Sequence, residues 1–183
     1  KSTLGRLIDF ALLMNRDPKF FLFKHLDIFK EFIFYLEVEL EDTLFLTIRR
    51  GVDEATRISF KKHQTGHQDF STLPSPEWDH SDVPFERAID LLDSLLDWRV
   101  LKPWSYRNGL GYLLRTQDDY QDVFQLRKFA GKHAYWKPFL AHILGFDAEL
   151  ISEHYDKEKQ LSEKQEKAET IKKELEIGRA SCR

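Results

Sequence analysis

Two adjoining stretches of alternating side chains constrain the fold more than any other feature of this chain. Apolar residues occupy every second position in residues 36–40 and again in residues 44–48. This period-two alternation predicts strands with one buried face, and the polar turn at residues 41–43 predicts that they pair as an antiparallel hairpin. A second turn at residues 51–54 is followed by a possible third strand over residues 56–60.

The flanking sequence predicts helices. Residues 4–14 are apolar on nearly every helical face, which is typical of a buried helix. The phenylalanine-rich stretch over residues 20–29 is interpreted as core packing. Helical spacing follows Pro84 over residues 85–98, a short apolar strand is expected over residues 110–114, and another helix over residues 139–144.

Polar residues in these segments have two interpretations each. Arg49 and Arg50 end the second strand and could contact a nucleotide or nucleic acid, but we expect a solvated edge charge. Three histidines and an aspartate lie in the polar loop predicted over residues 61–83: His63, His67, Asp79 and His80. A metal site would need a scaffold that fixes ligand geometry, so we expect a solvated loop.

A basic and aromatic cluster occupies residues 132–138. Tyr135 and Trp136 could stack on a base or another ring. Few positive charges lie nearby, so a packed corner is the favoured interpretation.

Composition is that of a globular chain. Of the 183 residues, 42% are hydrophobic and 32% charged, with a net charge of −3. This content excludes wholesale disorder, and no apolar run approaches the roughly 20 residues that span a bilayer. The final stretch, residues 177–183, breaks from the charged sequence before it and is interpreted as a translated sequencing adapter. Cys182, the single cysteine, would then not be native, which fits a reducing cytoplasm.

The stretch before that tail predicts a long exposed helix. Charges of both signs interleave over residues 156–176, without Pro or Gly. Leu161, Ala168 and Leu175 recur every seven residues, and Ile171 falls in the complementary core position. The pattern favours the start of a coiled coil over a lone charged helix, although Lys157 and Lys164 interrupt its core positions.

The opening triplet Lys1-Ser2-Thr3 runs directly into the first apolar helix. A phosphate-binding loop ends in this way: the lysine neutralises phosphate charge, the hydroxyl ligates Mg²⁺, and free helix N–H groups face the phosphates. The glycines of such a loop would precede Lys1. Later in the chain, Gln117 follows the strand expected over residues 110–114, and its amide could ligate Mg²⁺ and orient a water.

The order of these parts resembles the N-terminal half of the ATPase head of the SMC and RecN-like superfamily, which is built like ABC-type ATPases. The run from Lys1 to Phe10 is similar to the phosphate loop of uncharacterised bacterial SMC-like ATPases, Lys-Ser-Thr-Leu-x-x-Leu-Ile-Asp-Phe. Residues 143–147, where the head would lead into the coiled coil, are similar to the corresponding residues of those ATPases. The resemblance implies an α/β (α+β) fold: an ABC-type P-loop head lobe over residues 1–150, with an antiparallel hairpin, and a coiled-coil arm beginning at residues 151–176.

The resemblance also implies a site. Lys1 would hold the β- and γ-phosphates of ATP, Ser2 the Mg²⁺ ion and Thr3 the α-phosphate, while Gln117 would be the glutamine-loop residue. The acidic metal-and-water strand and the signature loop fall outside this chain, so the fragment alone should be catalytically inactive.

The resemblance implies partners as well. One partner is a second copy of the chain, in a homodimer that forms through the heads and the coiled coil. The other is DNA, in repair, chromosome handling or defence. The resemblance implies a cytoplasmic protein without a membrane. The alternative is a nucleotide-free coiled-coil adaptor with an α+β head, and a P-loop kinase ranks third. No basic stripe in the sequence itself points to DNA.

Overall fold

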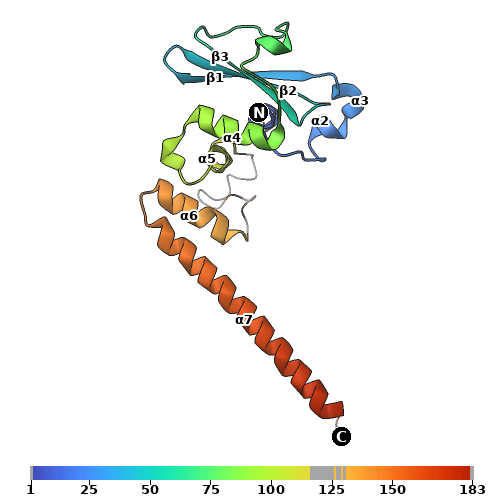
Figure 1. The fold of residues 1–183 in the computed structure, drawn as a ribbon, viewed down its shortest axis with the longest axis vertical. Helices are drawn as coiled ribbons and strands as arrows, with labels where there is room; N and C mark the ends of the chain where they lie inside the picture. Colours follow the sequence, from blue (N-terminus) through green and yellow to red (C-terminus); the bar gives the residue numbers. More distant parts are fainter. Residues whose placement is uncertain (1, 116–125, 127–128, 130, 182–183) are drawn as a thin grey trace. The chain divides into compact units, whose positions relative to one another are not determined.

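The computed structural model describes residues 2–115, 126, 129 and 131–181 (Figure 1). The chain divides into two compact units, Lys1–Gln117 and Asp118–Arg183. The first contains all the strands of the described residues, and the second contains the last two helices. The predicted mixed class of helices with an antiparallel sheet is therefore confirmed.

The first unit is built on a four-stranded antiparallel sheet in the order β1-β2-β3-β4. Its strands are β1 (Ile33–Glu41), β2 (Leu44–Gly51), β3 (Arg57–His63) and β4 (His80–Pro84). Leu36 lies opposite Ile48, and Ile48 opposite Phe60, so their side chains share one face. The predicted hairpin and third strand are confirmed, whereas β4 was expected to be loop.

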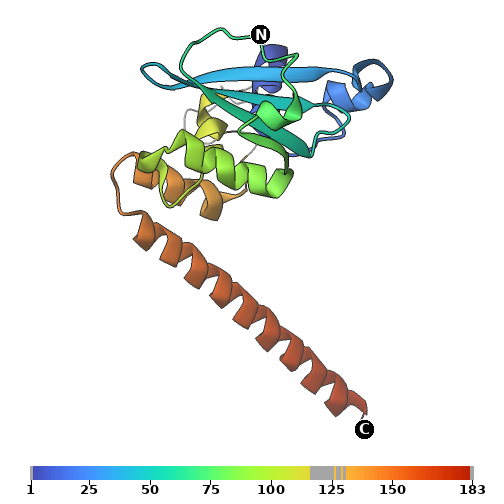
Figure 2. The ribbon, with the colours of Figure 1, turned by 45° about the horizontal axis from the view of Figure 1, so that its top comes forward.

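One face of the sheet is covered by the end of α1 (Ser2–Ala11), by α4 (Phe85–Leu96) and by α5 (Tyr106–Leu113). Figure 2 shows α4 lying along this face. The predicted helix after Pro84 is confirmed. The buried core between sheet and helices consists of Leu12, Leu13, Leu46, Ile48, Ile58, Phe60, Ala88, Leu92, Leu96, Tyr106 and Leu110.

A second core lies beside the first and is mainly aromatic. It gathers around Phe10, whose ring centroid is 6.1 Å from that of Phe20 and 5.6 Å from that of Phe34. The short helices α2 (Phe21–Lys24) and α3 (Leu26–Phe29) supply most of the rest. The phenylalanine-rich segment is therefore mainly core, as predicted, except that Ile28 is 60% exposed.

The strand predicted over residues 110–114 is wrong, because residues 110–113 belong to helix α5. Tyr106, Gly109 and Leu110 form its buried face at helical spacing. A short apolar run does not distinguish a strand from a buried helix, and packing decided the outcome here. Gly109 permits that packing, since a Cβ atom at this position would lie 2.8 Å from Cδ1 of the buried Leu101.

Two helical glycines therefore provide a matched stability test. Gly5→Ala should raise the free energy of unfolding by about 0.5–1 kcal/mol, because Gly5 lies within α1 and its added Cβ meets nothing within 4 Å. Gly109→Ala should give no gain or a loss, because contact with Leu101 opposes the same propensity benefit. Urea unfolding of both variants checks this, and an equal gain in both would show that the Leu101 contact costs nothing.

The opposite face of the sheet is partly covered by residues 64–79, which include the 3-10 helix η1 (Ser75–Glu77). The buried Trp78 ring lies 6.3 Å from Tyr35 on β1 and 6.2 Å from Phe70. Lys61 on β3 holds the end of this segment by donating to the Glu77 carbonyl at 2.8 Å. The polar segment over residues 64–79 therefore packs on the sheet.

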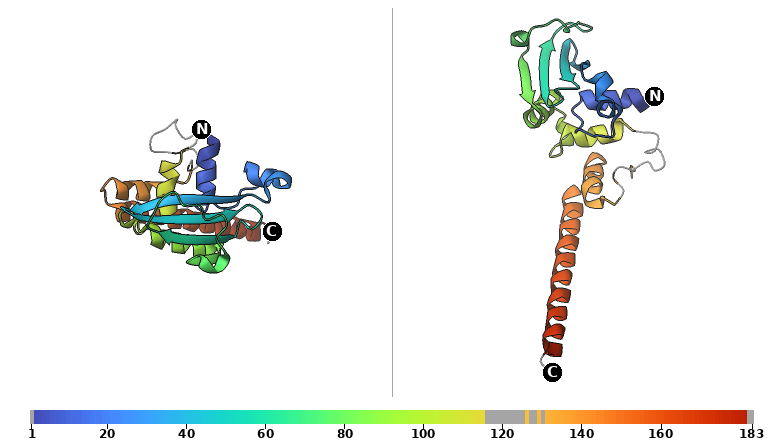
Figure 3. Two further views of the ribbon diagram at one scale, coloured as in Figure 1. Left: turned by 90° about the horizontal axis from the view of Figure 1, so that it is seen from above. Right: turned by 90° about the vertical axis from the view of Figure 1, so that its right-hand side faces the viewer.

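The second unit contains α6 (His133–Ile143) and α7 (Ala148–Ser181). The basic and aromatic cluster begins α6, so this helix starts six residues earlier than predicted. Trp136 is buried, as a packed corner requires, while Tyr135 is 50% exposed. Figure 3 shows α7 as one unbroken helix, and the predicted long helix is confirmed. In the described part of the chain, no helix combines the length and apolar character needed to cross a membrane.

Candidate functional site

The candidate nucleotide site falls at the start of α1. Thr3 lies in the first turn of this helix and is exposed. Ser2 is the first residue of α1, but its side chain lies outside the described residues, as do Lys1 and Gln117. The four proposed ligands are therefore not seen together, and the structure describes only the helix that would present three of them.

The first turn of α1 is open to solvent. Leu4 is 63% exposed, and burial is complete only from Phe10 onward. The prediction that this helix is buried is therefore wrong for its N-terminal part, because its packing against the two cores begins at Leu7. The first turn carries no carboxylate that would repel a phosphate.

The C-terminal end of α1 is held by side chains from α5. Arg107 forms an ion pair with Asp9 at 2.7 Å and donates to the Leu12 carbonyl at 3.0 Å. The Tyr106 hydroxyl donates to the same carbonyl at 3.2 Å. Cationic and hydroxyl donors at this end satisfy carbonyls that a helix leaves without partners and complement its dipole.

Arg50 of β2 holds the same end from the sheet side. Its Nε atom donates to the Ala55 carbonyl at 2.9 Å, and Nη1 donates to the carbonyls of Phe10 and Met14. The guanidinium lies 4.3 Å from the Phe10 ring centroid and 5.0 Å from that of Phe85. One side chain thus joins α1, β2, the turn after β2 and the start of α4.

The expectation that Arg50 is a solvated edge charge is wrong, since it is 1% exposed. Burial lowers its pKa to about 10, which leaves it charged at neutral pH. Three carbonyl acceptors and two aromatic rings replace the water it has lost. The alternation of β2 could have revealed this role, because Arg50 follows Leu46 and Ile48 at the next inward position.

His63 also differs from the prediction of a solvated loop. It ends β3, and its side chain is 7% exposed. Nδ1 donates to the Thr65 carbonyl at 2.8 Å, while Nε2 lies 2.9 Å from Thr47 Oγ1 and 3.7 Å from Glu37 Oε2. The ladder of β2 and β3 continues to this residue, which places it under residues 64–79.

His67 and His80 are exposed, as predicted, although two other groups of this region form hydrogen bonds within the first unit. The His67 backbone N–H donates to Glu37 Oε1 at 2.9 Å, and Asp79 accepts from the Lys62 N–H at 2.7 Å. Within the part of the chain that the structure describes, no group of three or more His, Cys, Asp or Glu side chains could hold a metal ion. The histidine-rich segment therefore offers no metal centre there.

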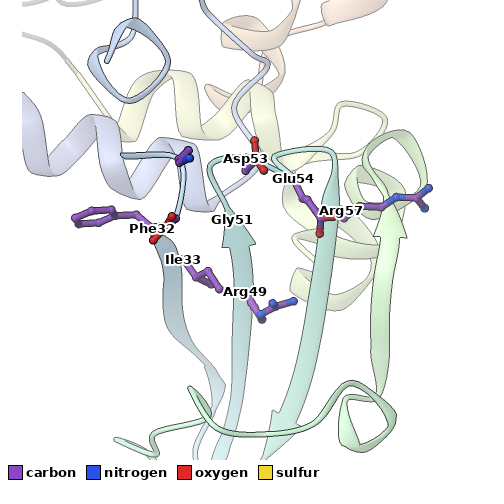
Figure 4. A pocket seen from close by; sticks show the side chains of 9 residues that line it. Phe32, Ile33, Arg49, Gly51, Asp53, Glu54 and Arg57 are labelled. Carbon is purple, nitrogen blue, oxygen red and sulfur yellow. The ribbon is translucent and has the colours of Figure 1, made fainter. Parts of the chain in front are cut away.

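A separate open groove of about 270 Å³ lies at the end of β2 (Figure 4). Its lining residues are Lys30, Glu31, Phe32, Ile33, Arg49, Gly51, Asp53, Glu54 and Arg57. Arg49 lies 3.8 Å from Asp82 Oδ1, and Arg57 donates to the Asp82 carbonyl at 3.3 Å. Cationic and acidic side chains are balanced in this lining, so its charge favours neither an anionic nor a cationic ligand.

Comparisons of the chain with models of protein families, with curated proteins and with solved structures gave no match.

Proposed function

We propose that this chain is the nucleotide-binding half of an SMC-like, ABC-type P-loop ATPase head, with α7 as the root of its arm. The observation that carries the proposal is the beginning of α1. The first turn of this helix is exposed at Thr3 and Leu4 and carries no carboxylate. Its other end is clamped by Arg50, Tyr106 and Arg107. A helix held in this way can present its N-terminus to an anion in a fixed orientation.

In the proposed site, Lys1 neutralises charge on the β- and γ-phosphates of ATP and Thr3 binds the α-phosphate. Ser2 ligates Mg²⁺, with Gln117 as a further ligand that also orients the attacking water. Mg²⁺ supplies charge neutralisation between phosphates. Two heads would close on shared nucleotide, so binding energy favours the dimer and hydrolysis releases it. DNA as a partner stays a prediction from the resemblance.

Substitution of Lys1 tests the proposal in the full-length protein to which we assign this chain. Lys1→Ala should lower ATP turnover about a hundredfold or more, because one preorganised charge on the transferred phosphate is lost. Steady-state phosphate release measures the effect, and binding of a fluorescent ATP analogue separates lost binding from lost chemistry. Lys24→Ala, which changes an exposed lysine of α2, is the matched control and should leave turnover unchanged.

Two outcomes would contradict the proposal. Normal turnover by the Lys1→Ala protein would show that this lysine is not in a phosphate loop. Failure of the unaltered full-length protein to bind ATP would favour the nucleotide-free adaptor instead. Residues 1–176 alone are expected to show no turnover, because the general base lies outside them in the proposed head.

A further inference from the structure

Two helices of the first unit lead to the proposed nucleotide ligands. Lys1, Ser2 and Thr3 stand at the start of α1, and Gln117 follows Leu113, the last residue of α5, by four positions. In the proposed site these ligands must meet one nucleotide, although they come from opposite ends of the first unit's sequence. Their arrangement therefore depends on how α1 and α5 are fixed to each other.

Arg107 of α5 joins the two helices directly. Its Nη1 atom lies 2.7 Å from Asp9 Oδ1 and donates to the Leu12 carbonyl at 3.0 Å. Asp9 and Leu12 are three positions apart, which places them on the same side of the helix end. Because one guanidinium binds both a side chain and a carbonyl at this end, it opposes rotation as well as sliding of α1 against α5.

The neighbouring Tyr106 anchors α5 itself. Its hydroxyl donates to the same Leu12 carbonyl at 3.2 Å, and its backbone N–H donates to Asp93 Oδ1 of α4 at 2.6 Å. Burial raises the pKa of Tyr106 above its ordinary value, so the hydroxyl keeps the proton that it donates. The start of α5 is therefore fixed on α4 next to the residue that grips α1.

The ion pair of Asp9 and Arg107 is poorly suited to a purely stabilising role. The Arg107 side chain is 27% exposed and that of Asp9 28%, and partly exposed ion pairs contribute little to stability. The same end of α1 is already held from the sheet by Arg50, which is 1% exposed, and by the fully buried Phe10. What Arg107 adds is the direct link between α1 and α5.

We infer that Asp9 and Arg107 are positioning residues of the proposed site, which fix α1 relative to α5 so that the phosphate loop and Gln117 meet the same nucleotide. Neither residue is a proposed ligand of ATP or Mg²⁺, and both act through the two helices. The inference deepens the proposed function and rests on it. The phosphate loop makes most of the proposed contacts with ATP, whereas Gln117 orients the attacking water. Loss of the link therefore slows the chemical step and leaves ATP affinity nearly unchanged.

Substitutions in the full-length protein test the inference. Arg107→Met should lower kcat for ATP hydrolysis about tenfold or more, while its affinity for a fluorescent ATP analogue changes less than about twofold. Asp9→Ala should lower kcat similarly. The double variant should lose no more than the more affected single variant, because both changes remove one link. Arg107→Lys keeps the charge and should recover part of kcat. Steady-state phosphate release measures kcat.

Arg99→Met is the matched control. Arg99 belongs to the 3-10 helix η2 (Arg99–Leu101) and forms an ion pair with Asp97, also at 2.7 Å, but its side chain is 86% exposed and joins neither α1 nor α5. This variant should leave kcat unchanged. Stability gives a second readout on residues 1–183, where Arg107→Met should shift the midpoint of urea unfolding by less than about 1 M.

The outcomes separate this inference from the proposed function. Loss of turnover in Lys1→Ala together with unchanged kcat in Arg107→Met would overturn the inference and leave the proposed function standing. Additive losses in the double variant, or a fall in kcat matched by an equal loss of ATP affinity or by unfolding, would show a structural role and overturn it as well. Normal turnover by Lys1→Ala would contradict the proposed function and this inference with it.

Discussion

Arg50→Ala should destabilise the first unit by about 3–5 kcal/mol. The substitution leaves the carbonyls of Phe10, Met14 and Ala55 without their donor and opens a cavity between two aromatic rings. The cost is reduced by the desolvation that the buried guanidinium no longer requires, which is the cause of its lowered pKa of about 10. Urea unfolding followed by tryptophan fluorescence measures the change, since Trp78, Trp98 and Trp104 lie in this unit.

Two further variants show which property of Arg50 matters. Arg50→Lys keeps the charge but cannot supply the planar set of donors, so an intermediate loss is expected. Arg49→Ala, one residue earlier on β2, removes a partly exposed arginine from the opposite face and should cost less than about 1 kcal/mol. If Arg50→Ala and Arg49→Ala were equally stable, the clamp on α1 would contribute little to the fold.

Phe10→Ala should destabilise the same unit by about 3–5 kcal/mol, for a different reason. Phe10 is fully buried, and its ring contacts Phe20, Phe23 and Phe34 at centroid distances of 5.6–6.1 Å. Removing the ring leaves a cavity in the aromatic core. It also removes one of the two rings that contact the Arg50 guanidinium. Urea unfolding is again the measurement.

Phe32→Ala is the control for Phe10→Ala, because Phe32 is 49% exposed. It should cost less than about 1 kcal/mol. Comparable losses in the two variants would mean that the aromatic core around Phe10 is not a main source of stability. The double variant Phe10→Ala/Arg50→Ala should lose less than the sum of the single losses, because the two side chains share contacts.

The hairpin and the long helix could be predicted because their signals are local. Alternation over residues 36–48 specifies which face of each strand is buried, and the turn at residues 42–43 sets the register, with Thr43 at a φ of 68°. Interleaved charges without Pro or Gly favour a helix throughout α7. In both segments the residues that decide the structure are neighbours in the chain.

The candidate site could be predicted only in part. The triplet at the start of α1 rests on a resemblance, and of its proposed ligands only Thr3 has a described side chain. The clamp at the other end of α1 was missed, because Arg50 and Arg107 reach Phe10 and Leu12 across 40 and 95 residues. Nothing in a short stretch of sequence reports such partners.

The sequence by itself determined the hairpin, the helix after Pro84 and the charged helix, since each has a local pattern that one backbone conformation satisfies, and it indicated the aromatic core segment by its phenylalanine content. Only the tertiary structure decided that residues 110–113 are helical, that Arg50 and His63 are buried, and that the first turn of α1 stays exposed. These features depend on which surfaces meet, and a side chain's burial is set by its neighbours in space and not by its own chemistry.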